Sequence, residues 1–252
     1  MIFLTGMHRS GTSLAALVLR DLGLTFGPES ELYGADDWNA HGYLERNDVI
    51  DINSRLITGA DRTTSRRAQA VSQLSYLGHS IRHKTGAHSK SHVREASGDL
   101  ANKITDLGQK LGTGAAKDPR FCLTMTEWRR HVEFDGLVVA LRHPAEAVAS
   151  LQRRNRIPAA LGHRFWRWHM TALLPHIDSE TLVLRQDELV GTRSSETIER
   201  AKHWLENRGV ECTGDGSSVI DSSLVHHRNN SDAPAASLKV WDALCRANSF
   251  TP

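Results

Sequence analysis

The residues with the clearest chemical pattern form a short loop near the start of the chain, at residues 6–13. Its sequence is Gly-Met-His-Arg-Ser-Gly-Thr-Ser. A glycine-rich loop that opens a helix presents backbone N–H groups that can bind an anion such as a phosphate. The spacing of Gly6 and Gly11 matches that of nucleotide-triphosphate P-loops, but Thr12 stands where those loops need a lysine. Arg9 supplies a cation within the loop instead, which suits a monophosphate that carries an adjacent sulfuryl group.

The residues around this loop predict the elements that would position it. Ile2, Phe3 and Leu4 form an apolar run typical of a short buried strand. After the loop, apolar residues recur at helical spacing over 14–22, and Gly23 provides a stop. An ordinary Gly/Ser turn is the alternative, and the combined context of strand, loop and helix favours the phosphate site over it.

Residues 9–13, Arg-Ser-Gly-Thr-Ser, resemble the 5′-phosphosulfate loop of the sulfotransferases that use 3′-phosphoadenylyl sulfate (PAPS). The resemblance implies that this loop binds the cofactor and that Arg9 is a catalytic cation. The cofactor-binding residues implied here are His8, Arg9, Ser10, Gly11, Thr12 and Ser13.

A second match follows the apolar run 137–141, which predicts a buried strand. Pro144 then predicts the first turn of a helix that carries Ser150. In sulfotransferases, an arginine at the end of such a strand and a serine eight residues later bind the 3′-phosphate, and the resemblance implies this role for Arg142 and Ser150. Arginine suits the role because its planar guanidinium makes two charge-assisted bonds to a phosphate. Without the first loop, a strand-end salt bridge and a surface serine would be the simpler interpretation.

A third match is Lys117-Asp118-Pro119-Arg120, which resembles the Lys-Asp-Pro motif of tyrosylprotein sulfotransferases and many bacterial sulfotransferases. There the lysine reaches the sulfuryl group, and the resemblance implies that Lys117 is a second catalytic cation. Transfer of a sulfuryl group spreads negative charge over its oxygens and the leaving phosphate, so fixed cations stabilise the transition state. The alternative is a solvated turn before a helix, because Asp-Pro commonly begins turns.

Three further segments resemble the same family with changes. Residues 186–190 resemble a Tyr-Glu-Asp-Leu-Val segment, but Gln186 replaces the tyrosine that often contacts adenine, and a tryptophan is the candidate substitute. Residues 42–45 resemble a Gly-Tyr-Trp-Glu element, with Leu44 in the aromatic place. Arg228 lies where the family closes a basic loop over the cofactor, which implies that it binds the cofactor.

A general base is needed to accept the acceptor's proton, and Glu45 is the first candidate. A carboxylate can accept a proton from a hydroxyl once desolvation raises its pKa. His41 and Glu31 are rivals, and the base of tyrosylprotein sulfotransferases lies closer to the loop arginine, at a position nearer to Glu29 or Glu31. Alternatively, Glu45 pairs with a nearby arginine such as Arg46.

Length and pattern predict the fold class. A chain of 252 residues can bury a substantial core, and strand and helix patterns alternate along it. We expect an α/β fold with a central parallel sheet flanked by helices, similar to that of P-loop NTPases. We expect a single domain over residues 1–252.

The composition bears on the cellular compartment and on the possible partners of the protein. Three cysteines lie far apart, which favours neither a disulfide framework nor a zinc site and fits a cytoplasmic protein. No apolar stretch is long enough to span a membrane, and no signal peptide is expected. A net charge of +2 is too small to indicate a nucleic-acid partner.

Basic residues gather in residues 62–94, which hold seven Lys or Arg and no Asp or Glu. We expect a lid or acceptor-binding segment around 60–112, whose charge attracts an anionic cofactor or acceptor. A solvated basic face is the alternative. Histidines at helical spacing also occur here, but without a nearby Cys or carboxylate they do not predict a metal site.

Two stretches are predicted to be structural. Residues 166–173 read as an amphipathic helix whose aromatic side chains form core or pocket wall. Residues 195–208 carry apolar residues at helical spacing and end at Gly209, which predicts a helix packed on the sheet.

The expected function is PAPS-dependent sulfation of a hydroxyl on a small molecule or carbohydrate, without a metal. One alternative is a P-loop kinase, which would need Mg²⁺ and the lysine that Thr12 replaces. Another is a catalytically silent nucleotide-binding module, and the presence of both Arg9 and Lys117 argues against it.

Overall fold

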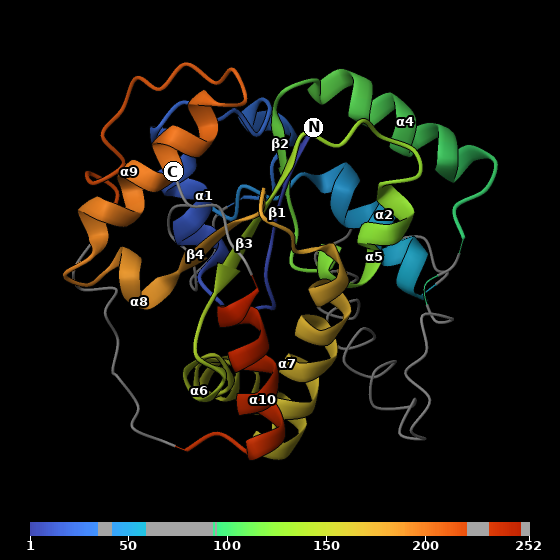
Figure 1. Cartoon of the computed structure of the whole chain (residues 1–252). Coiled ribbons are helices and arrows are strands. Elements are labelled where there is room, and N and C mark those ends of the chain that lie inside the picture. The colour runs from blue at the N-terminus through green and yellow to red at the C-terminus, as the bar shows by residue number, and fades with distance from the viewer. Residues whose placement is uncertain (35–41, 59–92, 94, 221–231, 248–252) are drawn as a thin grey trace.

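Four short runs of mostly apolar residues form one parallel sheet in the computed structural model of the chain, which describes residues 1–34, 42–58, 93, 95–220 and 232–247. The strands are β1 (Ile2–Thr5), β2 (Ala115–Lys117), β3 (Gly136–Leu141) and β4 (Leu182–Arg185). Their order in the sheet is β2-β1-β3-β4, and every neighbouring pair is parallel. Figure 1 shows these strands at the centre of the molecule with helices around them.

The helices predicted from the sequence are present, with boundaries close to the predicted residues. The described α-helices are α1 (Thr12–Asp21), α2 (Asn47–Thr58), α4 (Asp99–Leu111), α5 (Phe121–Trp128), α6 (Pro144–Asn155), α7 (Ala159–Leu173), α8 (Gln186–Leu189), α9 (Ser194–Glu206) and α10 (Ala235–Arg246). Short 3₁₀ helices occupy Glu29–Glu31 (η1) and Leu174–His176 (η3). The predicted helix after Pro144 is therefore α6, and the helices predicted near 166–173 and 195–208 are α7 and α9.

The two faces of the sheet are covered by different helices because side chains alternate along each strand. On one face, Ile2 and Leu4 pack in a core with α1 and α9. On the other, Phe3 packs with α5 and α7 in a second core. Figure 1 shows α1, α8 and α9 on one side of the sheet and α2, α4 and α5 on the other.

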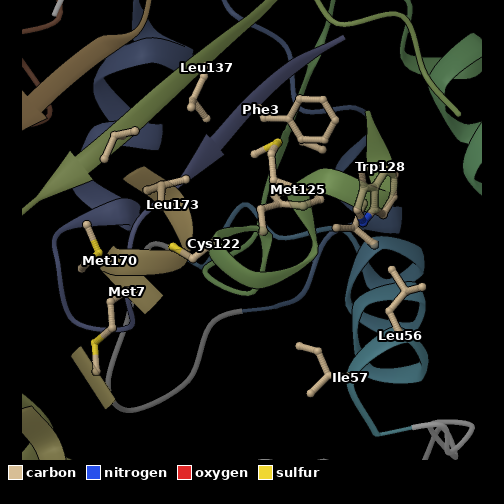
Figure 2. Packing of buried hydrophobic residues seen from close by; sticks show 14 of the residues in the cluster. Phe3, Met7, Leu56, Ile57, Cys122, Met125, Trp128, Leu137, Met170 and Leu173 are labelled. Atoms are coloured by element: carbon tan, nitrogen blue, oxygen red, sulfur yellow. The ribbon is translucent and has the colours of Figure 1, made fainter. Parts of the chain in front are cut away.

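Aromatic rings fill the second core. Phe3 meets Phe121 edge-on, with ring centroids 4.9 Å apart, and Trp128 at 6.1 Å. Figure 2 shows Phe3, Met125 and Trp128 gathered above α2, with Cys122 and Leu173 nearby. In α7, Trp166, His169 and Leu173 are fully buried, which confirms that this helix serves packing.

The predicted fold class is confirmed: the chain is an α/β domain with a parallel sheet flanked by helices. The proposed lid around 60–112 lies largely outside the described residues. Its last part is helix α4, where Ile104 and Leu107 are buried. None of the helices that the structure describes is long and apolar enough to cross a membrane.

Candidate functional site

The carboxyl ends of the four parallel strands bring the predicted site residues to one edge of the sheet. The register pairs Leu4 of β1 with Lys117 of β2, and Thr5 of β1 with Val139 of β3. The loop after β1 therefore lies between the end of β2 and the end of β3. This edge is where ligands bind in open parallel α/β sheets.

The loop after β1 is shaped by backbone conformations that favour glycine. Gly6 has φ +149°, and a Cβ there would lie 2.2 Å from the backbone oxygen of Ala140, so only glycine fits. Gly11 has φ +87° and precedes the first residue of α1. Arg9 also adopts a left-handed conformation, with φ +71°, which is uncommon for a residue with a side chain and frequent at binding sites. Ser10 is fully buried, and its Oγ has no hydrogen-bond partner among the residues that the structure describes.

Arg9 connects this loop to helix α6. Its Nε donates a hydrogen bond to Ser150 Oγ at 3.0 Å. Burial lowers the pKa of Arg9 from its usual value, and the nearby charges of Arg154 and Arg142 lower it further. A desolvated guanidinium close to other guanidiniums is stabilised when an anion binds.

Helix α6 presents a row of polar side chains at successive turns. Glu146, Ser150 and Arg154 are four residues apart, so they share one face of the helix. Arg142, just before the helix, donates from Nε to Glu146 Oε2 at 3.1 Å. Arg154 donates to Tyr43 Oη at 2.9 Å, and its guanidinium lies 5.7 Å from the centre of the Tyr43 ring. Arg154 was missed by the sequence analysis, although its position one turn beyond Ser150 was a usable signal.

Lys117 is fully buried at the end of β2 and contacts two other segments of the chain. Its Nζ lies 3.0 Å from Glu45 Oε1. It also donates to Ser13 Oγ at 3.1 Å and to the backbone oxygen of Tyr43. Lys117 therefore links the first turn of α1 to the segment that carries Tyr43 and Glu45.

Glu45 lies between two cations. Besides Lys117, it faces Arg120, whose guanidinium nitrogen is 3.7 Å from Glu45 Oε2. Arg120 is itself held by Asp118, which accepts from Arg120 Nε at 2.8 Å and is fully buried. In the alternative that Glu45 pairs with an arginine such as Arg46 or Arg20, the partner is different: Glu45 faces Arg120, while Arg46 pairs with Glu31 and Asp48.

Helix α2 holds the Glu45 segment in place through a buried polar contact. Asn53 Oδ1 accepts hydrogen bonds from Thr124 Oγ1 at 2.7 Å and from Trp128 Nε1 at 2.8 Å. One residue further, Ser54 Oγ accepts from Arg120 at 3.2 Å. These bonds fix α2 against α5, and so fix the chain that enters α2 beside Lys117.

His8 is enclosed between the loop and α7. Burial lowers the pKa of His8 well below its usual value, and the charges of His169 and Arg120 act in the same direction. The rings of His8 and His169 lie 6.1 Å apart, edge to face. A lowered pKa favours the neutral form of His8, so the cations of this site are lysine and arginine side chains, among them Lys117, Arg9 and Arg120.

The other candidate bases are placed differently. The pKa of Glu31 is lowered because Lys110 and Arg46 donate hydrogen bonds to its carboxylate. Glu29 is exposed in η1. His41 lies outside the described residues, as does Arg228. Of the described candidates, Glu45 is the one that contacts Lys117.

Gln186 and Trp241 lie near the carboxyl end of β4. Gln186 begins α8, and a Cβ at Gly11 would lie 3.4 Å from its side chain, so Gln186 covers the phosphate loop. Its Oε1 is buried, and within the described part of the chain it has no hydrogen-bond partner. Trp241 of α10 meets the His143 ring at 5.3 Å, and the Arg185 guanidinium lies 5.4 Å from the Trp241 ring.

No family model matches the chain, and no curated protein matches it. A solved structure does match: the sulfotransferase domain from the Synechococcus PCC 7002 olefin synthase, with a TM-score of 0.54 and 15% sequence identity. The match covers 97% of this chain and 94% of that chain. The chain therefore has the fold of a sulfotransferase domain over nearly its whole length.

Proposed function

We propose that the chain is a PAPS-dependent sulfotransferase. It transfers the sulfuryl group to a hydroxyl of a small molecule or carbohydrate and releases adenosine 3′,5′-bisphosphate. The observation that carries the proposal is the hydrogen bond from Arg9 to Ser150. Two segments far apart in the sequence, each with the pattern of a phosphate site for one end of the same nucleotide, meet at one edge of the sheet.

The residues at this edge fit a nucleotide with two anionic groups. The N-terminus of α1, the desolvated Arg9 and the unpartnered Ser10 Oγ form one anion site. Arg142 and Ser150 form the second, next to α6. A P-loop kinase lacks this second site and needs the lysine that Thr12 replaces.

Arg9 and Lys117 are the proposed catalytic cations. The acceptor oxygen forms a bond to sulfur while the bond between sulfur and the 5′-phosphate oxygen breaks. Arg9 and Lys117 stabilise the negative charge that grows on the sulfuryl oxygens and the leaving phosphate. Glu45, 3.0 Å from the Lys117 ammonium, accepts the proton of the acceptor hydroxyl.

Gln186 and Trp241 are the proposed neighbours of the adenine base. The buried Oε1 of Gln186 can accept a hydrogen bond from an exocyclic amine. Trp241 presents an aromatic ring beside Arg185 at the end of β4, where a base can stack. This pair would replace the tyrosine that many sulfotransferases use.

Calorimetry and turnover together test the proposal. The wild-type chain should bind adenosine 3′,5′-bisphosphate and should not bind ATP with Mg²⁺ at comparable strength. With labelled PAPS and a small-molecule extract, label should move to an acceptor. Tight ATP binding with phosphoryl transfer would support a kinase instead, and bisphosphate binding without turnover of any acceptor would support a silent module.

A further inference from the structure

Glu146 is an acidic side chain within the proposed 3′-phosphate site. It lies in the first turn of α6, and its Oε2 accepts a hydrogen bond from Arg142 Nε at 3.1 Å. Both side chains are largely buried, with exposed fractions of 11% for Arg142 and 21% for Glu146. Among the described residues, Glu146 is the acidic partner that Arg142 has.

The position of Glu146 on the helix places it beside the other residues of the same site. Ser150 follows one turn later on the same face, and Ser150 is bonded to Arg9. A first-turn acid stabilises a helix through the helix dipole, which would explain a glutamate here without a role in binding. The helix dipole does not explain why this carboxylate is hydrogen-bonded to Arg142, the arginine that is proposed to bind the 3′-phosphate.

A carboxylate on Arg142 opposes the binding of a phosphate in two ways. The hydrogen bond between Arg142 and Glu146 must be exchanged for one to the phosphate, and the carboxylate then lies close to a group of the same charge. A phosphate still displaces Glu146 from Arg142, because it carries more negative charge and more acceptor oxygens than the carboxylate. Glu146 therefore lowers the affinity for the 3′-phosphate without preventing binding.

We propose that Glu146 is a release residue: it takes back Arg142 when the 3′-phosphate leaves and so limits how tightly adenosine 3′,5′-bisphosphate is held. The inference rests on the proposed function, since it assigns the 3′-phosphate to Arg142. Release of product is a common limit on the turnover of enzymes, so a built-in competitor for one phosphate contact speeds the cycle. A nucleotide without a 3′-phosphate leaves the Arg142–Glu146 pair intact and does not experience the competition.

The test is Glu146→Gln, which keeps the shape of the side chain and an oxygen that accepts from Arg142 but removes the charge. Adenosine 3′,5′-bisphosphate should bind about three- to tenfold more tightly, the range expected for removal of a partly exposed ion pair, and should dissociate more slowly. AMP affinity should stay the same. The matched control is Glu196→Gln, because Glu196 is also a first-turn acid paired with an arginine, Arg193, on the distant helix α9.

The outcomes separate the inference from the proposed function. Weaker or unchanged bisphosphate binding in Glu146→Gln, with normal binding by the wild type, overturns the inference alone and makes Glu146 a residue that orients Arg142. An equal gain for AMP overturns it as well, because the effect would then be general charge. If the wild type binds no adenosine bisphosphate, the proposed function fails and the inference fails with it.

Discussion

Arg9 and Ser150 lie 141 positions apart in the sequence and are joined by a hydrogen bond of 3.0 Å from Arg9 Nε to Ser150 Oγ. The bond connects the loop after β1 to the helix after β3. Because Arg9 adopts a left-handed backbone conformation, its side chain depends on such partners to hold its direction. The two proposed phosphate sites are therefore mechanically linked, and each should respond to changes in the other.

Ser150→Ala is predicted to weaken binding of both adenosine 3′,5′-bisphosphate and AMP. Loss of the hydroxyl removes a proposed ligand of the 3′-phosphate and also frees Arg9, the proposed ligand of the 5′-phosphate. Each loss should be about 1 kcal/mol, the usual contribution of one hydrogen bond, as measured by calorimetry. Ser195→Ala, an exposed serine on α9, is the control. Unchanged AMP affinity would mean that Ser150 does not position Arg9.

Arg142→Ala is predicted to weaken bisphosphate binding alone. The expected loss is about 1.5–3 kcal/mol, the range for hydrogen bonds to charged groups, while AMP affinity stays the same. The thermal shift produced by each nucleotide gives the same comparison, because a ligand that binds the folded state raises its stability. Equal losses for both nucleotides would remove the assignment of Arg142 to the 3′-phosphate.

Three of the strands and the loop at residues 6–13 were predictable because local patterns specify them. Runs of apolar residues mark β1, β3 and β4, and Gly6 and Gly11 mark the loop. Strand β2 was not predicted, since Ala115–Lys117 is only three residues long and two of them are alanines. It becomes a strand through pairing with β1, which is a tertiary effect that no local pattern records.

The partners of the site residues were less accessible to sequence reasoning. The pairs Arg9–Ser150 and Lys117–Glu45 join segments that are distant in the chain, so their contact depends on the sheet order. The pair Arg142–Glu146 is local, and the spacing of four residues could have revealed it. The sequence motifs thus identified side chains that lie at this edge of the sheet. Only the fold shows which of these side chains form hydrogen bonds or ion pairs with one another.

Lys117→Met is predicted to lower kcat by about 10² or more while leaving bisphosphate affinity nearly unchanged, because Lys117 meets charge that develops during transfer. Lys117 is fully buried beside Glu45, so the variant should also be less stable. To correct for unfolded protein, kcat is calculated per bisphosphate-binding site, and the number of binding sites is measured by calorimetry. Lys103→Met, at an exposed pair on α4, is the control. Reduced affinity with unchanged kcat would make Lys117 a simple binding residue.

The buried His169 predicts a loss of stability in acid. Burial lowers the pKa of His169 from 6.5 to about 4, and its Nδ1 lies 2.9 Å from the backbone oxygen of Phe165. Between these two values the unfolded chain binds a proton at this residue and the folded chain does not, so the free energy of unfolding falls as pH is lowered. From pH 6.5 to pH 5 this amounts to about 1.6 kcal/mol.

Urea unfolding of the wild type and of His169→Asn at these two pH values measures the effect. The variant should lose less stability by about the same 1.6 kcal/mol, since asparagine does not titrate. His203→Asn, at an exposed histidine on α9, should keep the wild-type dependence. An identical pH dependence in wild type and His169→Asn would show that His169 is protonated in the folded state.

Glu45→Gln tests the proposed base. Turnover should fall by about 10² to 10⁴, the usual contribution of general-base catalysis. Bisphosphate binding should persist, since glutamine keeps an oxygen that can accept from Lys117. Melting temperature is measured alongside, because Glu45 is paired with a buried cation and a loss of folded protein must be separated from a loss of rate.

Glu31→Gln and His41→Ala are the matched rivals in that experiment. Glu31 is bound by Arg46 and Lys110, so its replacement should reduce stability and leave turnover per folded molecule near normal. Near-normal turnover in Glu45→Gln with a collapse in either rival would move the base to that residue and leave Glu45 as the residue that positions Lys117. If all three variants remain active, no protein base is needed, and the acceptor must ionise readily by itself. The search for the acceptor should then turn to acidic hydroxyls such as phenols, because a phenol loses its proton far more easily than an alcohol or a sugar hydroxyl.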